Sequence, residues 1–506
     1  MSVRSTPPGA RRRVSDASRA RSTPPPDLGR LPFAAAAALL PLALLALHHD
    51  LGHHGDIGFF HDWYEAFRAG PAFYRDGPGL NYPIVGVLLV CGPARLAEGL
   101  LGAPLDLATF TLLHKLVLAF GESLFVVAAA SLARTLRLAR PRLAALALYV
   151  LPSSWAAGAW FGQIDVWGSA LLLAAAAAAI RYRRHGRARS LLAALLALHA
   201  ALLTKQLTWF ALPGLGLLLA AALLRHRRPA HLTFAALSPA LWLLPDPFLE
   251  LPPGWSSHLW WIVAGGGSDH AELVVAGGAS LWSLVAEPGM ASSDWRLGGL
   301  SATAIGFGAF ALTLLRFLAA LPRGLPSRAL VLLAGLSNLA MCVLLTGVHE
   351  RYLVHGAPFL MLALATAGRR AMLASAAFVV AWWGAFVLGS LHFDAFAGPL
   401  VPLRMHTPCA ALLALLLAAF LVRPFARRAE AGGSGRHPAG APGSSGLPDA
   451  CGSDARPSDD RGPDARPSDA RPSDDRLPDD RLPDDRLSDR RDTDAPGSGA
   501  PREAAP

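Results

Sequence analysis

The sequence predicts an all-α polytopic membrane protein with about twelve spans, on three observations. Of its 506 residues, 53% are apolar and only 16% are charged, which exceeds the apolar share of an ordinary soluble protein. Long apolar runs recur, such as LPFAAAAALLPLALLAL at 31–47, and can cross about 30 Å of hydrocarbon as helices. Short arginine clusters separate these runs, as cytoplasmic loops do in membrane proteins.

The arginine clusters set the predicted topology. Lys and Arg accumulate in cytoplasmic loops, so we assign all six clusters and both termini to that side. The clusters lie at 134–142, 181–190, 225–228, 322–328, 368–370 and 423–428. The predicted spans are 31–48, 109–133, 143–160, 164–180, 190–204, 207–224, 230–247, 299–321, 329–346, 352–367, 371–391 and 408–422.

This assignment leaves two long loops on the outer side, 49–108 and 248–298. The second loop is rich in Trp, Gly and Ser, which suits a segment at the membrane interface. Within the first loop, YPIVGVLLVCGPARLAEGLLG at 82–102 would place the arginines of 134–142 outside if it crossed the membrane. Its purely apolar part covers only about half a bilayer, so we expect an embedded or interfacial helix there.

The two ends of the chain differ from the membrane region. Residues 1–30 are basic, and we expect a disordered cytoplasmic segment there. The apolar run that follows lacks a small-residue cleavage site, which favours a retained first span over a removed signal peptide. Residues 426–506 are mostly Pro, Gly, Ser, Asp and Arg with imperfect repeats, which predicts a disordered cytoplasmic tail. The transmembrane domain is therefore assigned to 31–425.

Charge and cysteine usage argue against several classes of function. The formal net charge is +10, but the arginines sit in short loop clusters and in the tails, which indicates membrane orientation and not nucleic-acid binding. The four cysteines are scattered without paired spacing, so they imply no disulfide framework and no cysteine metal site. The chain also lacks a glycine-rich nucleotide-binding motif.

Polar residues gather at the outer ends of the predicted spans, whereas the inner ends offer only arginine. Ionisable groups at membrane depth are costly and tend to mark function, so this distribution predicts a site on the outer face. Glu122, in mid-span, is left outside that site because it can pair with Lys115 seven residues earlier. The polar residues are Asp56, Asp62, His114, Lys115, Glu122, Gln163, Asp165, Lys205, Gln206, His349, Glu350 and Arg351.

Four short motifs resemble those of the GT-C polytopic glycosyltransferases, in the same order. GDIGFFHDW followed by LNYPI is similar to their DIxxFxxW followed by YPP, and AWFGQID is similar to their WGQxD. TKQ and VHERYL resemble their K(P)Q and HERYL elements. The resemblance covers 31 to about 425 and includes dolichyl-phosphate-glucose glucosyltransferases and bacterial polyprenyl-phosphate-hexose enzymes. YPI replaces YPP and TKQ lacks the proline, so the subfamily and its sugar stay open.

The resemblance implies that Asp56, which opens the first motif, is the catalytic base. A sugar hydroxyl that attacks an anomeric carbon needs such a carboxylate within hydrogen-bond reach. An outward-facing site has no nucleotide sugar, so we expect a polyprenyl-phosphate-linked hexose, mannose or glucose, and a glycolipid or glycan acceptor. Arg351, His349 and Lys205 are suited to hold the donor phosphate. The remaining predicted substrate-binding residues are Gln163, Asp165 and Asp62.

Two alternatives stay open at this point. The histidines His48, His49, His53 and His54, with nearby aspartates, are suited to a divalent metal such as zinc or manganese. We expect them instead to be solvated or interfacial loop residues, and we expect no cofactor. The other alternative is a transporter or flippase for a lipid-linked sugar or another solute, which has no need of a base in an outer loop.

Composition also bears on localisation. Heavy use of Ala, Arg and Gly fits a GC-rich genome, which favours a bacterial plasma membrane, or the ER membrane if the source is eukaryotic. In either case the membrane is a partner of the chain, and we expect the site on its outer or luminal face.

Overall fold

The computed structural model of the protein confirms the all-helical fold class. Within the described residues, β-structure is limited to one short antiparallel hairpin, β1 (Arg296–Leu297) with β2 (Leu300–Ser301), and one isolated bridge. The predicted tail 426–506 and most of the predicted segment 1–30 lie outside the described residues. The structure describes residues 26–48, 54–77, 80–262, 273–276, 278–286, 290–292, 294–366, 369–396, 400–422 and 425.

Seven helices in the described ranges are long and apolar enough to cross a membrane, by length and composition. A pair of helices bent by 81° makes an eighth if its two arms count as one span. The protein is therefore a multi-pass helical membrane protein. The seven are α1 (Arg30–His48), α4 (Ile84–Leu101), α5 (Leu107–Thr135), η3 (Gln206–Ala211) continued by α10 (Leu212–His226), α13 (Ala302–Ala319), α14 (Ser327–Leu344) and α16 (Arg370–Phe396).

The bent pair corresponds to the predicted span 143–160. Its first arm is α6 (Pro141–Val150), and its second arm joins α7 (Pro152–Trp155) to the π-helix η2 (Ala156–Trp160). Proline in a helix interior removes a backbone hydrogen bond and clashes with the preceding turn, so Pro152 accounts for the break between the arms. This predicted span is thus a broken helix.

Two other predicted spans, 230–247 and 352–367, are not continuous helices. In the first, a 3₁₀ segment with Pro239 in its first turn follows α11. In the second, Gly356 separates a 3₁₀ turn from a short helix that has Pro358 in its first turn. Proline cannot donate the amide bond that would continue the preceding helix. The pieces are α11 (Pro229–Leu237), η4 (Ser238–Trp242), η9 (Tyr352–His355) and α15 (Ala357–Ala365).

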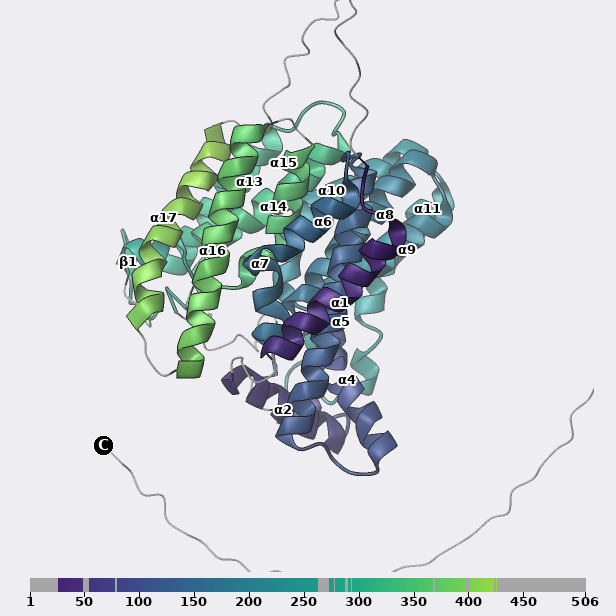
Figure 1. Ribbon diagram of the computed structural model, residues 1–506, viewed down its shortest axis with the longest axis vertical. Coiled ribbons are helices and arrows are strands. Elements are labelled where there is room, and N and C mark those ends of the chain that lie inside the picture. Colours follow the sequence, from purple (N-terminus) through teal and green to yellow (C-terminus); the bar gives the residue numbers. More distant parts are fainter. Residues whose placement is uncertain are drawn as a thin grey trace, which may run out of the picture. The chain divides into compact units, whose positions relative to one another are not determined.

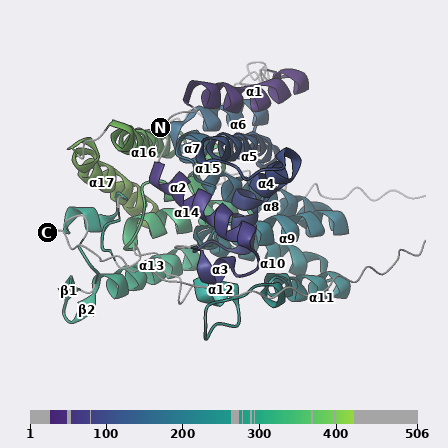
Figure 2. The same ribbon diagram turned by 90° about the horizontal axis from the view of Figure 1, so that it is seen from below.

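The centre of the bundle is α8 (Asp165–His185), which matches the predicted span 164–180. Its run of small residues, Ala175–Ala179, is buried and lets neighbouring helices approach closely. It packs against α5, α9 (Ala188–Leu202) and α10, as Figure 2 shows. Two shorter apolar helices, α9 and the apolar part of α17 (Leu400–Val422), occupy the predicted spans 190–204 and 408–422.

The two predicted outer loops lie together at one end of the bundle, which we call the loop end. The Nη1 of Arg75 lies 2.7 Å from Oε2 of Glu250, and the amide of Glu250 donates to the carbonyl of Pro71. Helices α2 and α4 are seen at this end in Figure 1. The loop elements are α2 (His54–Ala69), α3 (Phe73–Asp76), η5 (Asp246–Phe248), α12 (His258–Trp260) and η8 (Leu281–Leu284).

Predicted cytoplasmic loops meet at the opposite end, which we call the arginine end. Arg183 donates to the carbonyl of Leu325, and Arg184 donates to the carbonyl of Thr135. Both contacts lie at the C-terminal end of α8, away from Asp165. The clusters joined in this way are 134–142, 181–190 and 322–328. Their grouping at one end agrees with the topology that the arginines predict.

Helix α4 covers the stretch 82–102 and qualifies as a span by its length and composition. Near its start, the amide of Gly86 donates to the carbonyl of Leu203, and in its last turn Glu98 accepts a 2.9 Å hydrogen bond from the hydroxyl of Tyr64 in α2. Both ends of α4 therefore contact the loop end. Its length and composition also allow a full span, so the embedded or interfacial helix that the sequence predicts for this stretch stays a prediction.

Candidate active site

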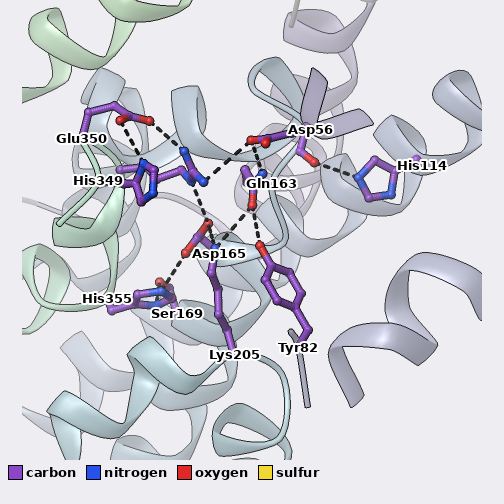
Figure 3. A network of polar contacts seen from close by, with 12 residues as sticks. Asp56, Tyr82, His114, Gln163, Asp165, Ser169, Lys205, His349, Glu350 and His355 are labelled. Atoms are coloured by element: carbon purple, nitrogen blue, oxygen red, sulfur yellow. Dashed lines mark hydrogen bonds and ion pairs between the residues drawn. The ribbon is translucent and has the colours of Figure 1, made fainter. Parts of the chain in front are cut away.

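Asp56 lies in the first turn of α2, at the loop end of the bundle. The next residue, Ile57, packs against Gly162, where an added Cβ would lie 2.9 Å from the Ile57 side chain. Gly162 has a φ of +91°, a backbone conformation that glycine adopts at little cost. Glycine at this position therefore brings the motif AWFGQID against α2. As a result, the side-chain amide of Gln163 donates to Oδ2 of Asp56 (Figure 3).

Both ends of the Gln163 side chain have partners. Its Nε2 donates to Asp56, while its Oε1 accepts from the hydroxyl of Tyr82 at 2.8 Å and from Nζ of Lys205 at 3.3 Å. Since the Lys205 ammonium can only donate and the Asp56 carboxylate accepts, the amide is fixed with its nitrogen toward Asp56. Gln163 thereby orients the Asp56 carboxylate and joins the first loop to the start of α8.

Asp165 begins α8 and is fully buried. Its Oδ2 lies 2.8 Å from Nζ of Lys205, and its Oδ1 lies 2.9 Å from Nε2 of His355. The Nε of Arg351 lies 3.9 Å from Oδ2. A buried carboxylate needs such compensation because an unpaired charge in the interior is costly. Asp165 therefore brings together basic residues from two other segments, Lys205 before η3 and the pair Arg351 and His355 at η9.

Arg351 links the two aspartates of the cluster. Its Nη2 lies 3.7 Å from Oδ2 of Asp56, and its Nη1 donates to Glu350 at 2.8 Å. The guanidinium stacks over the ring of Phe161, 4.9 Å from its centroid. Among the described residues, the buried Nε of Arg351 finds no hydrogen-bond acceptor. The guanidinium is thus held in place with donor capacity left over.

Glu350 and His349 complete the Arg351 side of the cluster. The Nδ1 of His349 lies 3.7 Å from Oε2 of Glu350, and its ring packs edge-on against Tyr352. Burial raises the pKa of Glu350, but the charge of Arg351 and the nearby imidazole of His349 outweigh that effect and hold the pKa well below 4.5. Glu350 is therefore ionised at neutral pH and balances the charge of Arg351.

The three carboxylates of the cluster differ in how much of the side chain is exposed to solvent. The side chain of Asp56 is 23% exposed, against 8% for Glu350 and 0% for Asp165. Both buried acids form close ion pairs with cations. Asp56 instead accepts a hydrogen bond from the Gln163 amide and makes a longer contact with Arg351. Asp56 is the acid of this cluster that a substrate can best reach.

The structure brings together most of the residues that the sequence predicts for the site. Asp56, Gln163, Asp165, Lys205 and Arg351 contact one another, and His349 joins them through Glu350. Figure 3 shows this network, which draws on the first loop, the start of α8, the segment before η3 and the segment before η9.

Asp62 does not belong to this network, and its predicted role in substrate binding stays a prediction. It is exposed, and six residues after Asp56 an α-helix has turned to a different face. The helical pattern of α2 therefore separates the two acids that the sequence places close together.

The candidate metal-binding histidines of the first loop, at 48, 49, 53 and 54, lie at the edge of the described residues. His49 and His53 lie outside the described residues, as do the side chains of His48 and His54. In the part of the chain that the structure describes, no group of three or more His, Cys, Asp or Glu side chains is arranged to hold a metal ion.

Sequence reasoning misses Tyr82, His355 and Ser169, which support the side chains of this cluster. Tyr82 fixes Gln163, and it is the tyrosine of the quoted motif LNYPI. His355 bonds to Asp165 and, through Nδ1, contacts Ser169 at 3.1 Å. His355 follows the HERYL motif by only two residues, but no sequence pattern indicates that its ring turns back toward α8.

Comparisons with known proteins add one structural likeness. No protein-family model matches the chain, and no curated protein matches it. Among solved structures, the chain is similar to ArnT from Cupriavidus metallidurans, in a crystal structure bound to undecaprenyl phosphate. The two share 17% sequence identity and a TM-score of 0.40 over 78% of this chain and 76% of that one. This score is too low to establish a shared fold.

Proposed function

We propose that the protein is an inverting glycosyltransferase of the GT-C type. It moves a hexose, mannose or glucose, from a polyprenyl-phosphate donor to a glycolipid or glycan acceptor on the outer face of the membrane, which in a bacterium is the plasma membrane. The observation that supports this most directly is the pairing of a partly exposed carboxylate, Asp56, with a buried guanidinium, Arg351, 3.7 Å away. One group suits proton abstraction and the other suits a phosphate.

In the proposed reaction, an acceptor hydroxyl attacks the anomeric carbon of the donor sugar. Asp56 takes the hydroxyl proton as the new carbon–oxygen bond forms. The bond from the anomeric carbon to the phosphate oxygen breaks at the same time, and its electron pair stays on that oxygen. A single displacement of this kind inverts the anomeric configuration and needs no covalent intermediate on the enzyme.

Charge develops on the leaving phosphate, and the cluster offers two cations to stabilise it. Arg351 presents a rigid fork of donors that matches a phosphate, and its buried Nε has an unused hydrogen. Lys205 is held 2.8 Å from Asp165, close to the same guanidinium. Preorganised donors of this kind stabilise a transition state strongly because they do not need to reorganise during the reaction.

A transfer assay tests the proposal. The purified chain in proteoliposomes is given synthetic polyprenyl-phosphate mannose or glucose and a membrane glycolipid extract, with and without EDTA. We expect a glycosylated lipid whose new linkage has the opposite anomeric configuration to the donor. Loss of activity with EDTA, restored by a divalent ion, would instead favour a metal site at His48, His49, His53 and His54.

The same vesicles test the transporter alternative. The transferase proposal would be overturned if the lipid-linked sugar moved between leaflets and neither the mannose nor the glucose donor gave a transfer product. Retention of the donor anomeric configuration in the product would overturn the single displacement while keeping the transferase class.

A further inference from the structure

Glu122 is a buried carboxylate in the middle of α5, away from the cluster around Asp56. Its side chain is 1% exposed. An ionisable residue at this depth is costly and needs partners within the protein. Neither the resemblance to known motifs nor the proposed reaction gives this residue a role.

The two oxygens of Glu122 bind the two arms of the broken span. The hydroxyl of Tyr149, in α6, donates to Oε2. The backbone amide of Ala159, in η2, donates to Oε1 at 2.7 Å. These arms meet at the 81° bend, so a single side chain from a neighbouring helix ties them together across the break.

The backbone around the break is built for this contact. Gly158 leaves the helical conformation, with φ −88° and ψ −117°, inside the π-helix η2. A Cβ at this position would collide with Oε1 of Glu122, so a larger residue there would displace the carboxylate. Oε1 of Glu122 accepts the amide of Ala159, the next residue, which also lies inside this π-helix.

The surroundings of Glu122 leave no room for a substrate. The cavity beside it, lined by Leu44, Leu45, Trp155 and Trp160 among others, has a volume of about 10 Å³. That is at or below the space that one water molecule needs. The carboxylate therefore acts on the protein itself.

We propose that Glu122 is a positioning residue that fixes the broken span and, through it, the segment 161–165 of the candidate active site. The inference rests on the proposed transferase function and deepens it. Ala159 is only two residues from Phe161, which supports the Arg351 guanidinium, and four from Gln163, which holds Asp56. A change in the direction of the second arm would therefore move both Phe161 and Gln163, which follow it directly in the backbone.

His114 supplies the other support of this segment. Its Nε2 lies 2.8 Å from the carbonyl oxygen of Gly162. His114 and Glu122 are both on α5, eight residues apart, and so share one face of the helix. The segment from Ala159 to Gly162 is thus fixed to α5 at two points, and Glu122 is the one beside the bend.

Substitutions at Glu122 separate positioning from folding. Glu122→Gln keeps an oxygen for the Ala159 amide and a polar group for Tyr149, whereas Glu122→Ala leaves both without a partner. We expect Glu122→Ala to lower kcat by about 10²-fold, the effect of a small misplacement of reacting groups, with little change in the KM for acceptor. Glu122→Gln should recover kcat to within a few-fold of the wild type. Tyr149→Phe should fall between them.

Hydrogen exchange of the same variants in nanodiscs gives a readout that does not depend on activity. Amides in 156–163 should exchange several-fold faster in Glu122→Ala than in the wild type, with unchanged exchange in α14. Gly158→Ala should behave like Glu122→Ala, while Gly216→Ala in α10, where an added Cβ meets nothing within 4 Å, is the matched control.

Turnover and hydrogen exchange together distinguish failure of this inference from failure of the proposed function. Normal kcat and normal exchange at 156–163 in Glu122→Ala would overturn the inference. So would equal losses in Glu122→Gln and Glu122→Ala, because positioning by hydrogen bonds predicts rescue by the amide. If the wild type shows no transfer while exchange at 156–163 still rises in Glu122→Ala alone, the proposed function fails and the tie across the bend stands.

Discussion

Lys205 and Asp165 form an ion pair of 2.8 Å in which neither side chain is more than 3% exposed. The pair joins the start of α8 to the segment that precedes η3, and His355 occupies the other oxygen of Asp165. Breaking a buried pair by removing one partner leaves an uncompensated charge, which is more damaging than removing both charges. The site is therefore part of what stabilises the bundle.

This pair gives the first prediction. Lys205→Met should lower the free energy of unfolding by about 3 to 5 kcal/mol, because Asp165 keeps its charge and loses its nearest cation. The double variant Lys205→Met with Asp165→Asn should lose less. Unfolding of the detergent-solubilised protein by a denaturing detergent measures both values. A double variant less stable than Lys205→Met would contradict the argument.

The second prediction concerns the proposed base. Asp56→Asn keeps the shape of the side chain but cannot accept a proton, so turnover should fall by roughly 10² to 10⁴ while donor binding survives. Asp62→Asn, on the same helix, should stay close to wild-type activity because Asp62 is exposed and lies on another face. Initial rates of transfer and a donor-binding titration provide the comparison. Full activity of Asp56→Asn would rule out the proposed mechanism.

Arg351 gives the third prediction. Arg351→Ala should weaken donor binding and also lower kcat, because the guanidinium binds the donor phosphate and binds it more strongly as negative charge develops during its departure. Arg351→Lys should not restore activity fully, since an ammonium lacks the fork that matches a phosphate. Glu350 loses its 2.8 Å partner in Arg351→Ala, so thermal stability has to be measured alongside. Unchanged donor affinity in a stable Arg351→Ala protein would remove this residue from the phosphate site.

The fourth prediction is a pH dependence of stability. The pKa of Glu350 is lowered in the folded protein from its ordinary value of 4.5. Below that value the unfolded chain binds a proton that the folded one does not, so stability rises with pH there. The contribution is fully present above about pH 4.5 and is lost as the pH falls further toward the folded pKa. In melting curves between pH 3 and 7, Glu350→Gln should flatten this acid-side slope.

The fifth prediction is topological. Single cysteines near 138 and 186, at the arginine end, should react with a membrane-impermeant reagent from one side, and cysteines near 100 and 270 from the other. Residue 100 decides the place of α4, whose two ends both contact the loop end. Residues near 70 and 100 flank α4, so labelling of these two positions from opposite sides would make α4 a full span and change the predicted side of every segment after it.

Much of the fold follows from local patterns. Apolar runs and arginine clusters identify the helices and their grouping, because hydrocarbon length and interfacial charge act on each segment separately. The predicted span 230–247 shows the limit of that reasoning, since its composition is mostly apolar while α11 ends at Leu237 and a 3₁₀ segment with Pro239 in its first turn follows. Apolar character indicates burial or lipid contact and does not require a continuous helix.

The candidate site was predictable as a set of motifs, and less so as a set of contacts. Asp56, Gln163 and Arg351 stand in recognisable patterns, whereas His355 and Glu122 are defined by what packs against them. The pairing expected between Glu122 and Lys115 assumed partners on one helix. Its partners instead come from both sides of a π-helical bend that no periodicity reveals.

Helix α8 also sets the depth of the site in the bilayer. Asp165 and Arg181 lie near its two ends, about 24 Å apart at the rise of an α-helix. With Arg181 at one headgroup layer, the cluster around Asp165 reaches nearly to the opposite boundary of a hydrocarbon core of about 30 Å. The phosphate of the proposed lipid donor can then reach the site sideways from its own depth in the headgroup layer, while the polyprenyl chain stays in the hydrocarbon core.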